Sequence, residues 1–208
     1  MKTTPPPLYV VTGFGRCGLT ATMQMLWVGG APMIGRAPAF EDIPGTARAP
    51  LGDDPATIDA QRGRVLKLLD PSVAALPPIP ARSVWLERDH TQQARSALKF
   101  MRQTGTLPCK ANRAMIGRFR KSYRDDTPKA IARLHRHGPV IRVRFEDLLA
   151  DPVTTAQRIA DHFGRDVFPE PEAGAAIILP RGPECQPDLA IEERAIRAAQ
   201  TLSEEATQ

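Results

Sequence analysis

The chain has 208 residues, a formal net charge of +5, 42% hydrophobic residues and 25% charged residues. These proportions exclude a mainly disordered chain, and the length suits one globular domain. Of the 28 basic residues, 22 are arginine and six are lysine. Two explanations fit this excess, a high-GC genome and an anionic ligand, because the arginine fork suits phosphate and sulfate oxygens.

Cysteine spacing and hydropathy exclude several further classes. Cys17, Cys109 and Cys185 are far apart and form neither a C-x-x-C pair nor a Cys/His set at metal-binding spacing. We therefore expect neither a disulfide scaffold nor a metal site. The amino-terminal residues lack an apolar run of signal length, and no stretch approaches the ~18 apolar residues that span a bilayer. The expectation is a cytoplasmic protein with no membrane partner, and the oligomeric state stays open.

The first elements are a strand, a glycine-rich turn and a helix. Residues 8–12 form a continuous apolar, β-branched run, which predicts a strand buried on both faces. The turn occupies residues 13–18, and residues 20–28 have helical periodicity. The face of this helix that we expect in the core carries Met23, Leu26 and Trp27.

Helices and strands alternate through the rest of the chain. Residues 31–56 have little periodicity and predict a long loop that covers a site. Further strands are predicted at residues 83–87 and 139–145. Further helices are predicted at residues 58–69, 91–104, 114–123, 128–137, 154–163 and 191–202. This alternation predicts an α/β fold with a short parallel sheet flanked by helices.

The turn after the first strand is the most specific feature of the sequence. It reads GFGRCGLT over residues 13–20 and resembles the phosphate loop G-x-x-x-x-G-K-[ST], with Leu19 in place of the lysine. The backbone amides of such a turn, the helix amino terminus and the Thr20 hydroxyl can bind an anion. The other interpretation is a plain strand–helix turn whose glycines only allow close packing. Without that lysine, an ATPase or kinase is disfavoured.

A second anion-binding group is predicted where the next strand ends. Arg88 follows that strand directly, and Ser96 lies eight residues later on the following helix. Side chains at the carboxyl edge of a parallel sheet can reach one ligand. The alternative for both residues is a solvated surface position.

Together, these segments resemble the sulfotransferase family that uses 3′-phosphoadenosine-5′-phosphosulfate. The family motif PRSGTT or PKSGTT is similar to GRCGLT at residues 15–20, and its strand ending in Arg-Asp with a later serine is similar to Arg88-Asp89 and Ser96. Residues 143–164, which begin VRFEDLLADP and end HFG, are similar to the family's YEDL…DP…FLG segment. The resemblance extends over residues 8–168.

The family's fold and domain organisation follow from this resemblance as expectations. It implies a P-loop-like three-layer fold in a single domain, residues 1–208. The loop-rich segment 31–56 and a Pro-rich carboxyl-terminal extension, residues 169–208, belong to that domain.

The resemblance also implies a role for individual residues. The donor's 5′-phosphosulfate would be held by the loop residues Gly15, Arg16, Cys17, Gly18, Leu19 and Thr20, and its 3′-phosphate by Arg88, Ser96 and Arg181. Arg16 would also stabilise charge on the bridging oxygen as the sulfuryl group moves to a hydroxyl or amine of a small molecule or saccharide. No metal is expected, because positioning and cationic donors stabilise this transition state.

The sequence departs from the family at the expected general base. The family's Lys-Thr-His segment is similar to Lys67-Leu68-Leu69, so the histidine is absent. Glu41 is a candidate base and Asp70 another, while a solvated carboxylate is the alternative for Glu41. Lys67 is either a contact to the sulfate or a helix-surface cation.

Three alternatives to an active sulfotransferase stay open. Cys17 and Leu19 stand where the family has hydroxyls, so a degenerate relative could bind the nucleotide without catalysis. An atypical nucleotide kinase or NTPase would lack its lysine. Residues 110–136 are rich in cations with Phe119 and Tyr123 between them, as a nucleic-acid surface would be. The mixed helical phases of those cations favour a solvated helix face instead, and nucleic acid is not an expected partner.

Overall fold

The computed structural model describes residues 5–41, 55–72, 76, 78–107 and 112–179. Its centre is a parallel sheet in the order β2-β1-β3-β4. The strands are β1 (Leu8–Gly13), β2 (Val65–Leu69), β3 (Ala81–Glu87) and β4 (Val140–Arg144). Every residue of β1 is buried, as the continuous apolar run predicts for a central strand covered on both faces.

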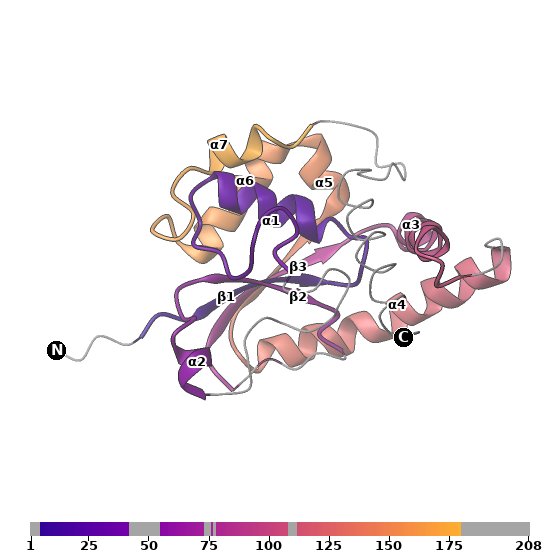
Figure 1. Ribbon diagram of the computed structural model, residues 1–208, viewed down its shortest axis with the longest axis horizontal. Helices are drawn as coiled ribbons and strands as arrows, with labels where there is room; N and C mark the ends of the chain where they lie inside the picture. Colours follow the sequence, from indigo (N-terminus) through magenta and orange to yellow (C-terminus); the bar gives the residue numbers. More distant parts are fainter. Residues whose placement is uncertain (1–4, 42–54, 73–75, 77, 108–111, 180–208) are drawn as a thin grey trace, which may run out of the picture.

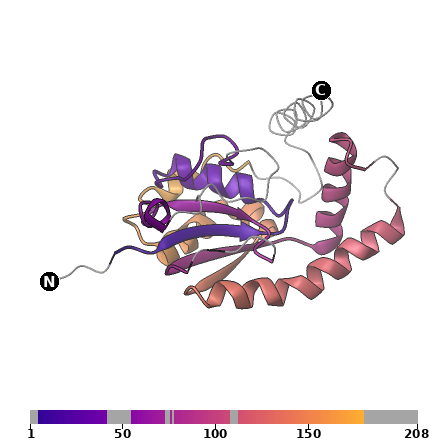
Figure 2. The same ribbon diagram turned by 60° about the horizontal axis from the view of Figure 1, so that its bottom comes forward.

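Helices cover both faces of the sheet and make three layers. The first layer contains α1 (Leu19–Val28), α5 (Phe145–Ala150), α6 (Pro152–Phe163) and α7 (Pro171–Ala175). α4 (Arg113–His135) crosses the other face, and α3 (His90–Gln103) stands at the carboxyl end of the strands (Figures 1 and 2). The short helix α2 (Pro55–Asp59) precedes β2. The predicted α/β, P-loop-like three-layer fold is confirmed.

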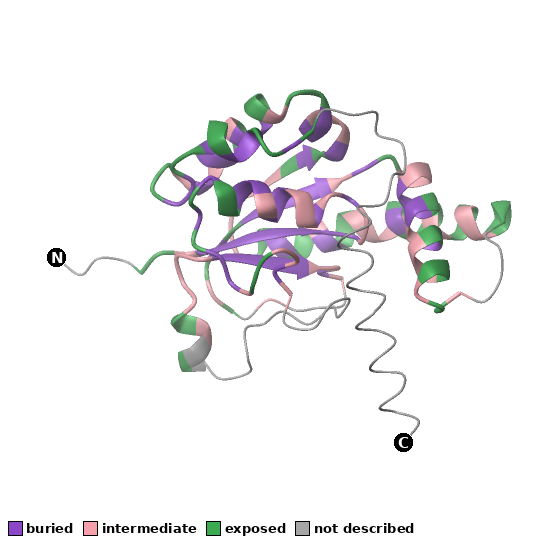
Figure 3. Ribbon diagram, turned by 45° about the horizontal axis from the view of Figure 1, so that its top comes forward, coloured by how far each residue is buried: buried purple, intermediate pink, exposed green. Residues whose placement is uncertain are grey.

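Alternation along β1 divides the core between the two faces. Tyr9 and Val11 pack with α1 and α5–α7, whereas Leu8 and Val10 belong to a smaller cluster on the opposite face. A third cluster joins Trp85 of β3 to α3 and α4. Figure 3 shows that the strands are buried along most of their length, whereas the outer faces of the helices are exposed.

Polar caps fix where the main helices begin. The Asp89 carboxylate accepts hydrogen bonds from the amides of Thr91 and Gln92 at the start of α3. Asn112 caps α4 through the Met115 amide at 2.9 Å. Each cap satisfies amides that have no partner inside the helix.

The helix predicted at residues 58–69 is wrong. α2 ends at Asp59, Gly63 turns the chain at φ 79°, and residues 65–69 form β2. A short apolar run of this length suits a buried strand as well as a helix, and pairing with β1 selects the strand. The sheet therefore has one strand more than the three predicted.

The two helices predicted at residues 114–123 and 128–137 are one helix, α4, with Pro128 inside it. Pro128 is exposed, so water can reach the carbonyl group that loses its amide partner. Directly before the proline, the Thr127 hydroxyl donates to the Tyr123 carbonyl at 2.6 Å. These features let the helix continue through the proline.

Other differences are local. On α1, Met23 and Leu26 are buried as predicted, but Trp27 is 51% exposed and meets the Phe40 ring edge-on with centroids 6.1 Å apart. An additional short helix, α5, precedes the predicted helix α6. The helix predicted at residues 191–202 and most of the loop beyond residue 41 lie outside the described residues. Within the part of the chain that the structure describes, no helix has the length and apolar character to cross a membrane.

Candidate functional site

The glycine-rich loop between β1 and α1 lies where three strands end. Gly13 pairs with Leu69 at the end of β2, and its carbonyl accepts a hydrogen bond from the Asp70 amide at 3.0 Å. β3 ends on the other side of β1, directly before Arg88. This carboxyl edge is the ligand-binding edge of open α/β sheets.

The first turn of α3 and the end of β3 hold the outer side of the loop. The buried Gln93 amide donates to the carbonyl groups of Phe14, at 3.1 Å, and Gly15, at 2.9 Å. Arg88 Nη1 donates to the Arg16 carbonyl at 3.2 Å. The C=O and N–H of a trans peptide unit point in opposite directions, so the amides of residues 15–17 point away from this side. Among the described residues, no backbone carbonyl accepts a hydrogen bond from Gly15 or Gly18.

The structure brings Arg16, Arg88 and Ser96 into one cluster beside the loop. Arg16 Nε donates to Ser96 Oγ at 3.1 Å, and the Arg16 guanidinium lies 5.1 Å from the centroid of the Phe100 ring. Arg88 is 8% exposed, and its guanidinium lies 4.6 Å from the centroid of the Phe145 ring. Arg88 and Ser96 are therefore placed at the loop, and the solvated-surface interpretation of both is wrong.

Two loop residues face the core and can reach a ligand only through their backbone. Cys17 is fully buried and Leu19 is 5% exposed, and both pack in the cluster beneath α1. The side chains at these two positions therefore contribute apolar volume to the core. Burial raises the pKa of the Cys17 thiol to about 12, which leaves it neutral at ordinary pH.

Glycine is required at two positions of the loop for different reasons. A Cβ at Gly13 would lie 2.6 Å from Cys17 Sγ and 2.6 Å from the Leu86 carbonyl oxygen. Gly18 has φ 99°, and a Cβ there would meet the Phe145 ring at 2.5 Å. The backbone at both positions therefore lies too close to the core to carry a side chain.

We expect Cys17 to resist alkylation in the folded protein. Iodoacetamide reacts with the thiolate, and burial of Cys17 both raises its pKa and blocks access. Peptide mass mapping after treatment at about pH 8 should find Cys17 unmodified before denaturation and modified after it. Equal labelling of native and denatured protein would contradict the buried position.

A buried cation from β2 reaches the other side of the loop. Lys67 is 6% exposed, and its ammonium group donates to Thr20 Oγ1 at 2.9 Å, to the Ala39 carbonyl at 2.9 Å and to Glu41 Oε1 at 2.5 Å. Burial lowers the pKa of Lys67, and the Glu41 carboxylate opposes that shift. The helix-surface interpretation of Lys67 is therefore wrong.

The segment before Glu41 is attached to both β2 and α1. Met33 forms an isolated parallel bridge with Val65. The Val65 amide donates to the Pro32 carbonyl, and the Val65 carbonyl accepts from the Ile34 amide. Gln24 of α1 donates its side-chain amide to the Pro38 carbonyl at 3.2 Å. These contacts carry Glu41, whose side chain is 19% exposed, to the loop. The interpretation of Glu41 as a carboxylate standing in water is wrong.

Sequence reasoning missed several residues that support the loop. Helical spacing could have identified Gln93, because it lies three residues before Ser96 and so on the same face of α3. Phe14 is packed between Trp85 and Tyr123, with ring centroids 5.2 Å and 5.4 Å away. No local pattern identifies this stack, because its members come from three elements.

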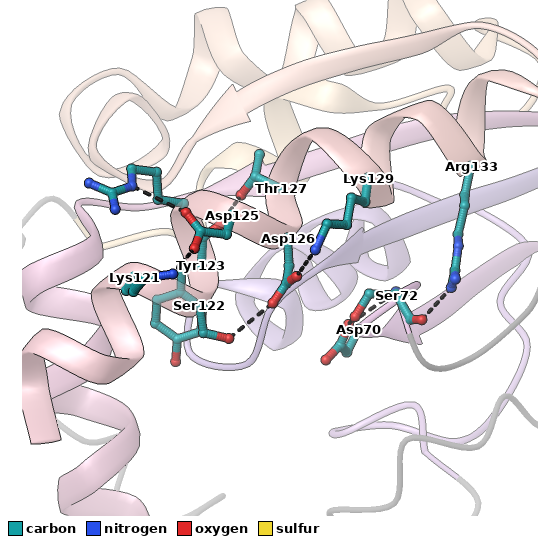
Figure 4. Close-up of polar contacts among 11 residues, drawn as sticks. Asp70, Ser72, Lys121, Ser122, Tyr123, Asp125, Asp126, Thr127, Lys129 and Arg133 are labelled. Carbon is teal, nitrogen blue, oxygen red and sulfur yellow. Dashed lines mark hydrogen bonds and ion pairs between the residues drawn. The ribbon is translucent and has the colours of Figure 1, made fainter.

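Asp70, the other candidate base, follows β2 in the left-handed region, at φ 50°. Its carboxylate accepts hydrogen bonds from the Ser72 amide and hydroxyl, and Arg133 donates to the Ser72 carbonyl (Figure 4). These bonds tie the chain after β2 to α4. Arg181 lies outside the described residues, and within them no group of three His, Cys, Asp or Glu side chains could hold a metal.

Comparisons with known proteins give a family. The model of the sulfotransferase family matches residues 64–170, which include Lys67, Arg88 and Ser96 and begin after the glycine-rich loop. No curated protein matches the sequence.

Two solved structures are similar to this chain. One is retinol dehydratase in complex with androsterone and inactive cofactor PAP, with 15% identity, 96% of this chain and 81% of that chain covered, and a TM-score of 0.43. The other is the sulfotransferase domain from the curacin biosynthetic pathway, with 13% identity, coverages of 97% and 99%, and a TM-score of 0.46. Family membership rests on the family model, which spans half of the sequence. The chain belongs to the sulfotransferase family.

Proposed function

We propose that this chain transfers the sulfuryl group of 3′-phosphoadenosine-5′-phosphosulfate to a hydroxyl or amine of a small molecule or saccharide. The observation that carries the proposal is the arrangement of two cations from separate elements around one loop. Arg16 lies in the loop, and Lys67 reaches it from β2 through the Thr20 hydroxyl. Arg16 is close enough that its charge contributes to lowering the pKa of Lys67.

The donor would bind along the carboxyl edge of the sheet. In this proposal, the 5′-phosphosulfate lies on the amides of residues 15–20, where the amino terminus of α1 adds its dipole. Arg88 and Ser96 bind the 3′-phosphate, because a buried arginine and a buried hydroxyl, both joined to Arg16, suit a doubly charged ester. We assign Arg181 to the same phosphate from the family resemblance alone.

Transfer would follow an in-line displacement at sulfur. The acceptor oxygen or nitrogen forms a bond to sulfur while the bond from sulfur to the bridging phosphate oxygen breaks. The electron pair of that bond goes to the phosphate, where Arg16 stabilises the charge, and Lys67 stabilises the equatorial sulfuryl oxygens. Glu41 accepts the proton of the acceptor, as its position on the Lys67 ammonium allows.

Thermal unfolding with two nucleotides tests donor binding. A ligand that binds only the folded state at 100 times its Kd adds ~2.7 kcal/mol to the free energy of unfolding. For a chain of this length, that raises Tm by about 5–10 °C. We expect this shift with adenosine 3′,5′-bisphosphate and a much smaller one with ATP and Mg²⁺, because only the bisphosphate offers a 3′-phosphate to Arg88 and Ser96.

Two other outcomes have definite meanings. A shift with ATP and Mg²⁺ alone would favour a nucleotide kinase or NTPase and contradict the proposal. A shift with the bisphosphate but no release of it from the sulfated donor, over a panel of hydroxyl and amine acceptors, would favour a protein that binds the nucleotide without catalysis. Leu69, which stands where the family has its histidine base, is the observation that favours this second candidate.

A further inference from the structure

A polar hollow of about 410 Å³ lies between the start of α3 and the middle of α4. Asp89 and His90 line it from the α3 side, and Gly117, Arg120, Lys121 and Arg124 line it from α4. The four α4 residues recur at intervals of three and four, so they share one helix face. Three cations therefore converge on one open hollow.

The negative charges near the hollow are already engaged. The Asp89 carboxylate caps α3 by accepting hydrogen bonds from Thr91 and Gln92, at 3.0 Å and 2.9 Å. Asp125 pairs with Lys121 at 2.5 Å and with Arg124 at 3.4 Å (Figure 4). Lys121 and Arg124 are 71% and 72% exposed in these pairs, and ion pairs at such exposure are weak enough for an incoming anion to exchange with them.

Gly117 keeps the floor of the hollow open. A Cβ at this position would have no atom within 4 Å, so no packing demands glycine here. Glycine in an exposed helix interior costs about 1 kcal/mol relative to alanine. What glycine provides is space above the helix, at the point where a side chain would stand among Arg120, Lys121 and Arg124.

The hollow is separate from the donor loop but adjoins it. Asp89 directly follows Arg88, which holds the loop through the Arg16 carbonyl. On the α4 side, the His90 ring lies 5.9 Å from the Tyr123 ring, which in turn stacks on Phe14 of the loop. Phe14 and Tyr123 thus stand between the two positions.

We propose that this hollow is a second anion site, which binds a sulfate or phosphate ester group carried by the sulfuryl acceptor. The inference rests on the proposed function and gives the acceptor a chemical class, a molecule that already carries at least one ester anion. Arg120 and Arg124 supply planar forks for two ester oxygens, and Lys121 supplies a point charge between them.

Calorimetric titration of sucrose octasulfate tests the site in protein saturated with adenosine 3′,5′-bisphosphate. Binding should weaken by about tenfold or more in Arg120→Glu and in Gly117→Glu, because each puts a carboxylate into the hollow. The matched controls are Arg118→Glu, the same charge change about half a turn away from Arg120 around α4, and Gly117→Ala, which adds only a methyl group. Both should bind within about twofold of the unchanged protein.

Two results would overturn the site. One is the absence of binding to the unchanged protein, and the other is an equal loss in Arg118→Glu, which would show diffuse attraction to a basic helix. The proposed function fails separately, by the absence of a thermal shift with the bisphosphate. If that shift is absent and sucrose octasulfate still binds in a manner that depends on Arg120, the assignment of the hollow to an acceptor is overturned.

Discussion

Replacing Arg16 with alanine is expected to lower kcat for sulfuryl transfer by about 10²–10³-fold. The Arg16 guanidinium is held by Ser96 and lies over Phe100, so it is in place before the donor binds. A cation fixed in this way stabilises charge on the leaving phosphate without reorganising in the transition state. The measurement is the steady-state release of adenosine 3′,5′-bisphosphate from the sulfated donor in the presence of an acceptor.

Arg95→Ala is the matched control for Arg16→Ala. Arg95 is exposed on α3, the helix that carries Ser96, and its replacement removes the same charge without touching the loop. We expect kcat to change by less than about twofold in this control. A kcat in Arg16→Ala equal to that of the unchanged protein would refute the catalytic role of Arg16, even if KM rises.

Replacing Lys67 with methionine should have an effect of similar size on transfer, about 10²–10³-fold in kcat. Methionine keeps the length of the side chain but removes the ammonium group that joins Thr20, Ala39 and Glu41. It also leaves the half-buried Glu41 carboxylate without its cation, which should lower the free energy of unfolding by about 1–3 kcal/mol. Urea denaturation measures that loss independently of activity.

A double variant separates catalysis from stability at Lys67. Combining Lys67→Met with Glu41→Gln removes the uncompensated charge, so most of the lost stability should return. Transfer should stay low, because neither the cation nor the carboxylate base is present. If Lys67→Met keeps both its free energy of unfolding in urea and its kcat, the ion pair between Lys67 and Glu41 contributes to neither stability nor transfer, and the proposed mechanism is wrong.

The fold was predictable where local patterns act alone. The buried run of β1, the glycine turn and the capped helix α3 each have a short-range signal, and all occur close to their predicted positions. β2 had no such signal. Its apolar residues suit two structures, and only parallel pairing with β1, more than fifty residues away in sequence, distinguishes them.

The residues of the candidate site also divide into those that a local pattern predicts and those that depend on long-range packing. The spacing predicted that Arg88 and Ser96 reach one ligand, because strand ends and helix starts of a parallel sheet meet at one edge, and the family resemblance added Arg16; the structure joins all three. The burial of Lys67 depended on the strand that the sequence did not reveal. The inward position of Cys17 and Leu19 depended on how the loop packs beneath α1, which residue type alone does not specify.

The bridge between Met33 and Val65 has a consequence for solubility. β2 lies at the edge of the sheet, where exposed amide and carbonyl groups could pair with another molecule. At this edge, the Val65 amide and carbonyl are already hydrogen-bonded to Pro32 and Ile34. The same stretch of chain continues to Glu41. Substitutions that detach this stretch would therefore expose the Val65 amide and carbonyl to pairing with another molecule, so they should promote aggregation and also displace Glu41 from the loop.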